Sequence, residues 1–205
     1  MIPKTLHQIW IGPLQAPLEW MASWRDQNPA MEYVLWEEEK LEDFGFKFQD
    51  RIEYLISEGR LSVASDIMRV EILDRLGGVY VDADSVCVKP IESAPFMEKD
   101  FFAVRDYDHK KKLQGQVNLV ANGTIGSTAG HPVLKDYLKR IGETKATGWW
   151  EYGARMLTDS IKGHKVVILP SYAFYPKNWD GRKAPAEGAN YAYHKWGTTT
   201  GSYNK

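Results

Sequence analysis

The sequence has little of several features that define other classes of protein. Cys87 is the single cysteine, so no disulfide can form within the chain and the fold requires no oxidising compartment. The chain contains no uninterrupted apolar run of about 18 residues, and no positively charged, apolar segment opens it. We therefore expect a soluble, cytoplasmic protein with no signal or membrane anchor in this chain.

An excess of charge of one sign is also missing. The chain has 26 basic and 27 acidic residues and a formal net charge of -1. No overall field attracts a polyanion, so we expect no nucleic-acid partner. Because 205 residues suit one domain and no repeat or linker divides them, we expect a single domain over residues 1–205, with a longer parent protein as the alternative.

Aromatic residues, in contrast, are plentiful. The chain has eight tryptophans and eleven tyrosines, whose rings fill cores but also stack on sugars and bases. Apolar periodicity predicts helices and strands that alternate along the chain, which indicates an α/β fold with a central mixed sheet between helices. The predicted strands are 5–11, 31–36, 79–81, 101–104, 117–125 (interrupted by a turn at Asn122-Gly123) and 165–169, and the predicted helices are 17–27, 52–58, 62–76, 132–141 and 149–161.

Residues 61–84, LSVASDIMRVEILDRLGGVYVDAD, organise the rest of the chain. The first part is free of glycine and proline and predicts a helix, which the two glycines end. The next residues, VYV, predict a short strand that leads into Asp82 and Asp84. Side chains two apart on a strand project to the same side, so we expect these two carboxylates to converge on one point.

The same helix carries a polar face at its amino end. Asp66 and Arg69 are three residues apart and therefore lie on one side of the helix. They can form a surface ion pair or part of a site, and their closeness in sequence to Asp82 and Asp84 favours a site.

Two more places on the chain offer candidate site residues. Trp10 follows the first strand, at the end where ligands gather in open α/β sheets, although a core tryptophan would fit as well. Near the carboxyl end, His194 and Trp196 are two apart, which in an extended chain puts them on one side. From the sequence alone, His194 is either a metal ligand or a surface imidazole.

The segment ASDIMRVEILDRLGGVYVDAD resembles the core signature of the DXD-containing sugar transferases with a GT-A fold, which include yeast mannosyltransferases of glycosyltransferase family 32. It is also similar to the glucosylating domains of large clostridial toxins. IPKTLHQIWIG, AGHPVL and the last dozen residues extend the resemblance. It implies a GT-A fold and a metal-dependent, retaining transfer of a hexose or deoxyhexose from a nucleoside-diphosphate sugar to a glycan or polysaccharide. A UDP-sugar is favoured over GDP-mannose as the donor.

The resemblance also implies individual roles. Mn²⁺ or Mg²⁺ is expected as the cofactor, because carboxylates with an imidazole suit such a cation. The expected metal ligands are Asp82, Asp84 and His194, and the expected catalytic residues are Asp66, Arg69, Asp82 and Asp84. Donor contacts are expected from Trp10, which packs against the base, and from Leu61, Asp66, Arg69, Tyr80, Asp82, Asn122 and Trp196.

Three other functions remain open on the sequence. VDADSV also resembles the nucleophile motif of aspartate-dependent phosphatases, although no Asp-Asp pair follows it. A glycoside hydrolase would use two carboxylates on opposite sides of a bond, against the convergence expected for Asp82 and Asp84. A non-catalytic sugar-binding module would explain the aromatic residues but not the paired carboxylates.

Overall fold

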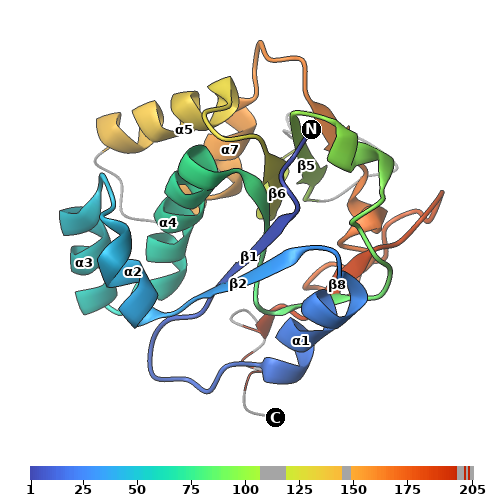
Figure 1. The fold of residues 1–205 in the computed structure, drawn as a ribbon, viewed down its shortest axis with the longest axis horizontal. Coiled ribbons are helices and arrows are strands. Elements are labelled where there is room, and N and C mark those ends of the chain that lie inside the picture. Colours follow the sequence, from blue (N-terminus) through green and yellow to red (C-terminus); the bar gives the residue numbers. More distant parts are fainter. Residues whose placement is uncertain (107–118, 145–148, 198–200, 202, 204–205) are drawn as a thin grey trace.

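The computed structural model describes residues 1–106, 119–144, 149–197, 201 and 203. Its centre is a six-stranded mixed sheet in which β6 runs antiparallel to its neighbours β3 and β5, while the other neighbouring pairs are parallel (Figure 1). In spatial order the strands are β2 (Glu32–Trp36), β1 (Thr5–Ile9), β3 (Gly78–Val81), β6 (Val120–Ser127), β5 (Phe101–Arg105) and β7 (Val167–Leu169).

Helices cover one face of this sheet and mostly irregular segments cover the other. The first face carries α2 (Glu38–Phe44), α3 (Gln49–Ser57), α4 (Leu61–Leu76), α5 (Pro132–Glu143), α6 (Trp149–Tyr152) and α7 (Ala154–Ser160). The second face carries α1 (Leu18–Gln27), the short 3₁₀ helices η1 (Pro95–Glu98) and η2 (Ser171–Ala173), and a small sheet of β4 (Ser85–Cys87) and β8 (Ala192–His194).

Two hydrophobic cores result from the alternation of side chains along the strands. In β5, Phe101 belongs to the core beneath the helices, whereas the next residue, Phe102, belongs to the core on the opposite face. In β3, Tyr80 faces the helices and Val79 and Val81 face away from them. This period of two is the pattern of a sheet that is buried on both sides.

The central helix α4 lies deep in the protein. Every residue from Asp66 to Leu73 is buried, including the charged residues Asp66, Arg69 and Glu71. The helix ends as predicted at two glycines with positive φ, Gly77 (67°) and Gly78 (100°), where only glycine adopts the backbone conformation without strain.

Four details differ from the sequence predictions. Asn122 and Gly123 form no turn but lie within the continuous strand β6, because hydrogen bonds to β3 and β5 outweigh the local turn preference. The helix predicted over 149–161 is divided at Gly153 into α6 and α7. The strand predicted over 165–169 is shorter and only half-buried, since it lies at the sheet edge. Helical spacing places Leu76 on the same face as Leu73, yet Leu76 is exposed.

Pairing of β4 with β8 brings the two informative ends of the sequence together. Ser85 lies opposite His194 and Cys87 opposite Ala192 in this antiparallel pair. The segment that follows the paired aspartates is therefore tied to the carboxyl-terminal segment. Among the described residues, no helix combines the length and apolar character that crossing a membrane requires.

Candidate metal and donor site

The two aspartates lie where the inner strand β3 ends. The strand stops at Val81, and the next residues turn sharply, with the Ser85 amide donating to the carbonyl of Asp82 (3.1 Å). The carboxylates of Asp82 and Asp84 therefore converge through a turn rather than through the extended chain that the sequence suggested. The hydroxyl of Ser85 also donates to the Asp82 carbonyl (2.6 Å), which fixes this turn.

His194 completes the cluster from β8. Its Nε2 lies 3.3 Å from Oδ2 of Asp82 and 3.1 Å from Oδ1 of Asp84. Ligand atoms of the three residues all lie within 4.8 Å of one another, in an arrangement that could hold a metal ion. Of the described residues, this is the one group of three or more acidic, histidine or cysteine side chains with that property.

The charges of this cluster are strongly coupled. Burial opposes ionisation of Asp82, but Arg69 and His194 outweigh it and hold the pKa of Asp82 well below its usual range. Burial likewise opposes a charged imidazole, yet Asp84 and Asp82 raise the pKa of His194 to about 10. The backbone N–H of Trp196 donates to Nδ1 of His194 (3.0 Å), and this hydrogen bond disfavours a proton on Nδ1. The two carboxylates thus favour a positive charge between them, which either a protonated imidazole or a metal cation can supply.

Behind the cluster lies a buried ionic network that joins α4 to β3 and β6. Arg69 reaches Oδ1 of Asp66 (3.1 Å) and Oδ1 of Asp82 (3.0 Å), and also donates to the carbonyl of Asn122 (2.9 Å). Its guanidinium lies over the Tyr80 ring, 4.4 Å from the centroid, in a cation–π contact. The surface ion pair considered from the sequence is therefore wrong: the Arg69 side chain is only 6% exposed.

Asp66 occupies an unusual environment within this network. The side-chain amide of Asn122 donates to its Oδ1 at 2.6 Å. Burial raises the pKa of Asp66 to about 6, and the neighbouring charge of Asp82 adds to this rise while Arg69 and Asn122 oppose it. The Asp66 carboxylate consequently gains a proton at a higher pH than an exposed aspartate does.

Of the other predicted donor contacts, Tyr80 touches the cluster directly, whereas Trp10 and Leu61 lie at the loop that follows β1. Trp10 is half-buried just after β1; its indole N–H donates to the Leu14 carbonyl (2.9 Å), and its ring meets Tyr203 edge-on at 5.1 Å between centroids. Leu61, at the start of α4, packs against Gly12 in the loop after Trp10. Tyr80 donates to Oδ1 of Asp82 (3.0 Å).

Trp196 stands next to the metal-type cluster. Its ring centroid is 4.4 Å from that of His194, and its φ of 56° is the one positive φ among the described non-glycine residues. This kink, rather than an extended chain, brings the two rings together. It also lets the Gly197 amide donate to Oδ2 of Asp84 (2.8 Å).

Several contacts in the site were not anticipated from the sequence. Gly123 and Gly197 offer backbone groups to Asp82 and Asp84, and Gln8 donates from its side chain to the Asp82 carbonyl (3.2 Å). Tyr175 packs its ring near His194, at 5.8 Å between centroids. No local sequence signal marks these residues, because their roles arise from long-range packing.

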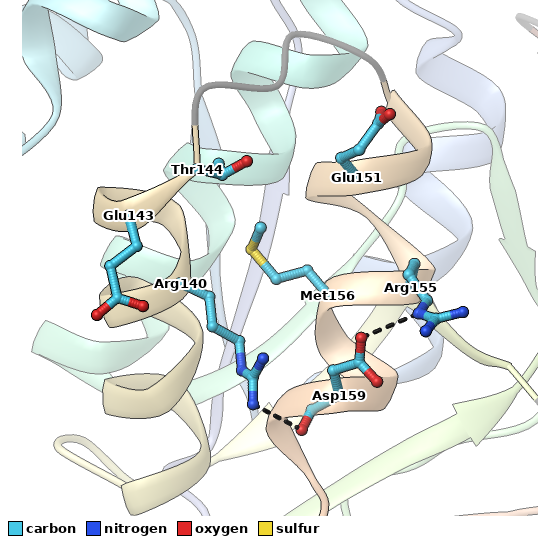
Figure 2. A pocket seen from close by; sticks show the side chains of 7 residues that line it. All are labelled: Arg140, Glu143, Thr144, Glu151, Arg155, Met156 and Asp159. Carbon is cyan, nitrogen blue, oxygen red and sulfur yellow. Dashed lines mark hydrogen bonds and ion pairs between the residues drawn. The ribbon is translucent and has the colours of Figure 1, made fainter.

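A separate hollow lies between α5 and α7. It has a volume of about 320 Å³, and Figure 2 shows Arg140 reaching across it to the carbonyl of Asp159. Arg155 also pairs with Asp159 (2.9 Å). None of the predicted site residues lines this hollow.

The chain is similar to known glycosyltransferases. The family model described as a glycosyltransferase sugar-binding region containing a DXD motif matches residues 18–102. An uncharacterized glycosyltransferase of Acanthamoeba polyphaga mimivirus is 28% identical over 145 residues, 67% of this chain and 54% of the relative. Inositol phosphoceramide mannosyltransferase 3 of Schizosaccharomyces pombe is 27% identical over 150 residues, 68% of this chain and 37% of the relative. The chain thus spans about half or less of the length of these relatives.

Among solved structures, the PaToxG glycosyltransferase has a similar fold. Its TM-score is 0.62 at 21% identity, over 78% of this chain and 68% of the solved chain. This likeness confirms the predicted GT-A fold, and the family match agrees with the resemblance carried by residues 61–84.

Proposed function

We propose that this chain, a DXD-type glycosyltransferase domain with a GT-A fold, moves a hexose or deoxyhexose from a nucleoside-diphosphate sugar to a glycan or polysaccharide acceptor. The observation that carries the proposal is the convergence of Asp82, Asp84 and His194 within 4.8 Å, directly beside the buried Asp66–Arg69 pair. Residues 1–205 act as a single domain in this proposal, and a UDP-sugar is favoured over GDP-mannose as the donor.

The residues present fit a divalent cation. Two carboxylates and one imidazole provide oxygen and nitrogen ligands that suit Mn²⁺ or Mg²⁺. Nε2 of His194 lies 3.3 Å from an oxygen of Asp82 and 3.1 Å from an oxygen of Asp84, so the candidate ligand atoms of the three residues already face one another. When bound, the cation would stabilise the negative charge that builds on the leaving diphosphate.

The protein's own groups would bind and orient the donor around that point. Arg69 is held rigidly by Asp66, Asp82 and the Tyr80 ring, so its position costs little ordering on binding. Asp66 and Asn122 present polar groups that suit sugar hydroxyls. Exclusion of water would fall partly to the carboxyl-terminal segment, because hydrolysis of the donor competes with transfer.

The aromatic residues support a nucleotide at the outer end of the site. Trp10 is half-buried and follows the parallel strand β1, at the strand end where open α/β sheets bind ligands. We propose that it packs against the base, with Leu61 beneath the adjoining loop and Trp196 on the diphosphate side. Retention of anomeric configuration by front-face displacement, which the family resemblance implies, is part of the same proposal.

The competing functions fit the geometry less well. A phosphatase nucleophile at Asp82 would need a free carboxylate oxygen, but Oδ1 is held by Arg69 and Tyr80 and Oδ2 faces His194. A glycoside hydrolase would need its two carboxylates to flank a bond, whereas those of Asp82 and Asp84 share one imidazole proton donor.

A donor panel tests the proposal. We expect a set of nucleoside-diphosphate sugars with Mn²⁺ to raise the melting temperature, because a ligand at a hundred times its Kd adds about 2.7 kcal/mol of stability. The stabilising donor should then yield a glycosylated product with an acceptor mixture. Absence of a shift with every donor, or phosphate release without sugar transfer, would refute the proposed reaction.

A further inference from the structure

Gly123 of β6 backs the carboxylate of Asp82. The Asp82 amide donates to the Gly123 carbonyl (2.9 Å), so the two residues are paired through their backbones. A Cβ placed on Gly123 would lie 2.2 Å from Oδ2 of Asp82 and 3.1 Å from the hydroxyl of Tyr175. The backbone of Gly123 is not in the positive-φ region, so space, rather than backbone conformation, accounts for the glycine here.

Tyr175 backs His194 on the same side. Its ring is buried, and its hydroxyl donates to Oγ1 of Thr124 (3.1 Å), the residue after Gly123. The ring centroid lies 5.8 Å from that of His194 and 6.1 Å from that of Trp196. A single anchored ring therefore supports the segment that carries the histidine.

We propose that Gly123 and Tyr175 are positioning residues that set the metal affinity of the site. They form one wall, and this wall holds Oδ2 of Asp82 and the ring of His194 at the separation at which both can face one cation. The inference rests on the proposed metal-dependent function and deepens it. Groups that orient metal ligands commonly change metal affinity by about 10- to 100-fold when they are altered.

The two carboxylate oxygens of Asp82 have different neighbours, and this difference distinguishes a positioning role from ordinary packing. Oδ2 of Asp82 is the oxygen that faces His194, whereas Oδ1 is held by Arg69 and Tyr80 on the other side. A methyl group at Gly123 must therefore displace the metal-facing oxygen. The effect should appear first in the affinity for the metal.

A matched pair of glycines in one strand provides the test. A Cβ on Gly126, also in β6, would meet the ring of Phe102 at 2.0 Å, in the core rather than at the cluster. Binding of Mn²⁺ to the full chain is measured by electron paramagnetic resonance titration, with and without UDP, and melting temperature is recorded for each variant. We expect Gly123→Ala to weaken Mn²⁺ binding at least about tenfold, and Gly126→Ala to lower the melting temperature while its folded form binds Mn²⁺ as the wild type does.

A second pair keeps the inference testable if Gly123→Ala fails to fold. Tyr175→Phe retains the ring that supports His194, whereas Tyr175→Leu keeps an apolar side chain but removes the ring. We expect the phenylalanine variant to retain nearly wild-type Mn²⁺ affinity and the leucine variant to lose about tenfold.

The outcomes distinguish this inference from the proposal beneath it. Wild-type chain that binds no Mn²⁺, with or without UDP, would overturn the metal dependence and the inference together. If the wild-type chain binds Mn²⁺ and folded Gly123→Ala or Tyr175→Leu binds it with the same affinity, the inference alone is overturned. Equal weakening by Gly126→Ala would also overturn it, because general loosening of the fold would then explain the loss.

Discussion

A buried histidine outside the metal-type cluster should make the stability of this fold depend on pH. His7 in β1 is fully buried, and both ring nitrogens have partners. Nδ1 accepts from the indole of Trp36 (3.1 Å), and Nε2 donates to the carbonyl of Gly77 (2.9 Å), in the turn that precedes β3. A second proton on Nδ1 would face the Trp36 N–H, so the neutral ring is the form that fits.

The size of the effect follows from the pKa of the ring. Burial lowers the pKa of His7 from 6.5 to about 4, although the Gly77 carbonyl opposes the change. The unfolded chain therefore binds more protons between those values, and the contribution of His7 to stability, complete above pH 6.5, is lost as the pH falls toward 4. From pH 7 to pH 5 the loss is about 2 kcal/mol, which is about 4–8 °C in melting temperature for a chain of this size.

The assay compares the wild type with His7→Gln in chemical denaturation at several pH values. Glutamine does not titrate and can still donate to the Gly77 carbonyl, so the difference between the two curves isolates His7. That subtraction is needed because Asp66, whose pKa is raised to about 6, contributes with the opposite sign. Parallel curves from pH 7 to pH 5, or an imidazole of His7 that titrates near 6.5 by NMR, would refute the reasoning.

Three further predictions concern the site itself. Asp84→Ala should abolish transfer while the central sheet persists, because the buried carboxylate pairs with the carboxyl-terminal segment, through His194 and the Gly197 amide; sugar transfer by this variant, or by wild type in excess EDTA, would contradict the metal role. Arg69→Met should cost about 3–5 kcal/mol of stability, since it leaves the buried carboxylates of Asp66 and Asp82 without their cation, and adding Asp66→Asn should restore part of the loss in urea denaturation. Trp10→Ala should raise the donor KM about tenfold with little change in melting temperature, because stacking on a base contributes about 1–3 kcal/mol; an unchanged KM would remove the stacking role.

Local patterns in the sequence were sufficient for the elements around the DXD motif. The glycine pair that ends α4, the strand that follows it and the placement of Asp66 and Arg69 on one helix face all depend on neighbours within a few residues. Such short-range geometry is set by backbone periodicity, so it could be predicted without the rest of the chain. The class of fold followed from the same alternation of helices and strands.

The local pattern misled where long-range hydrogen bonds outweighed it. Asn122-Gly123 has the composition of a turn, yet pairing on both sides keeps it within β6. In this strand the Asn122 side-chain amide donates to Asp66, and the lack of a side chain at Gly123 leaves room for the carboxylate of Asp82. These roles depend on which strands are neighbours, and the sequence does not state that order.

The sequence alone could name His194 as a candidate, but only the tertiary structure made it a partner of the aspartates. It lies 112 residues beyond Asp82 in the chain, and pairing of β4 with β8 places it beside both carboxylates. The wall formed by Gly123 and Tyr175 arises in the same way. Residue type determined which groups can bind a cation, whereas the sheet topology decided which of them meet, because convergence of distant segments depends on the packing of the whole chain.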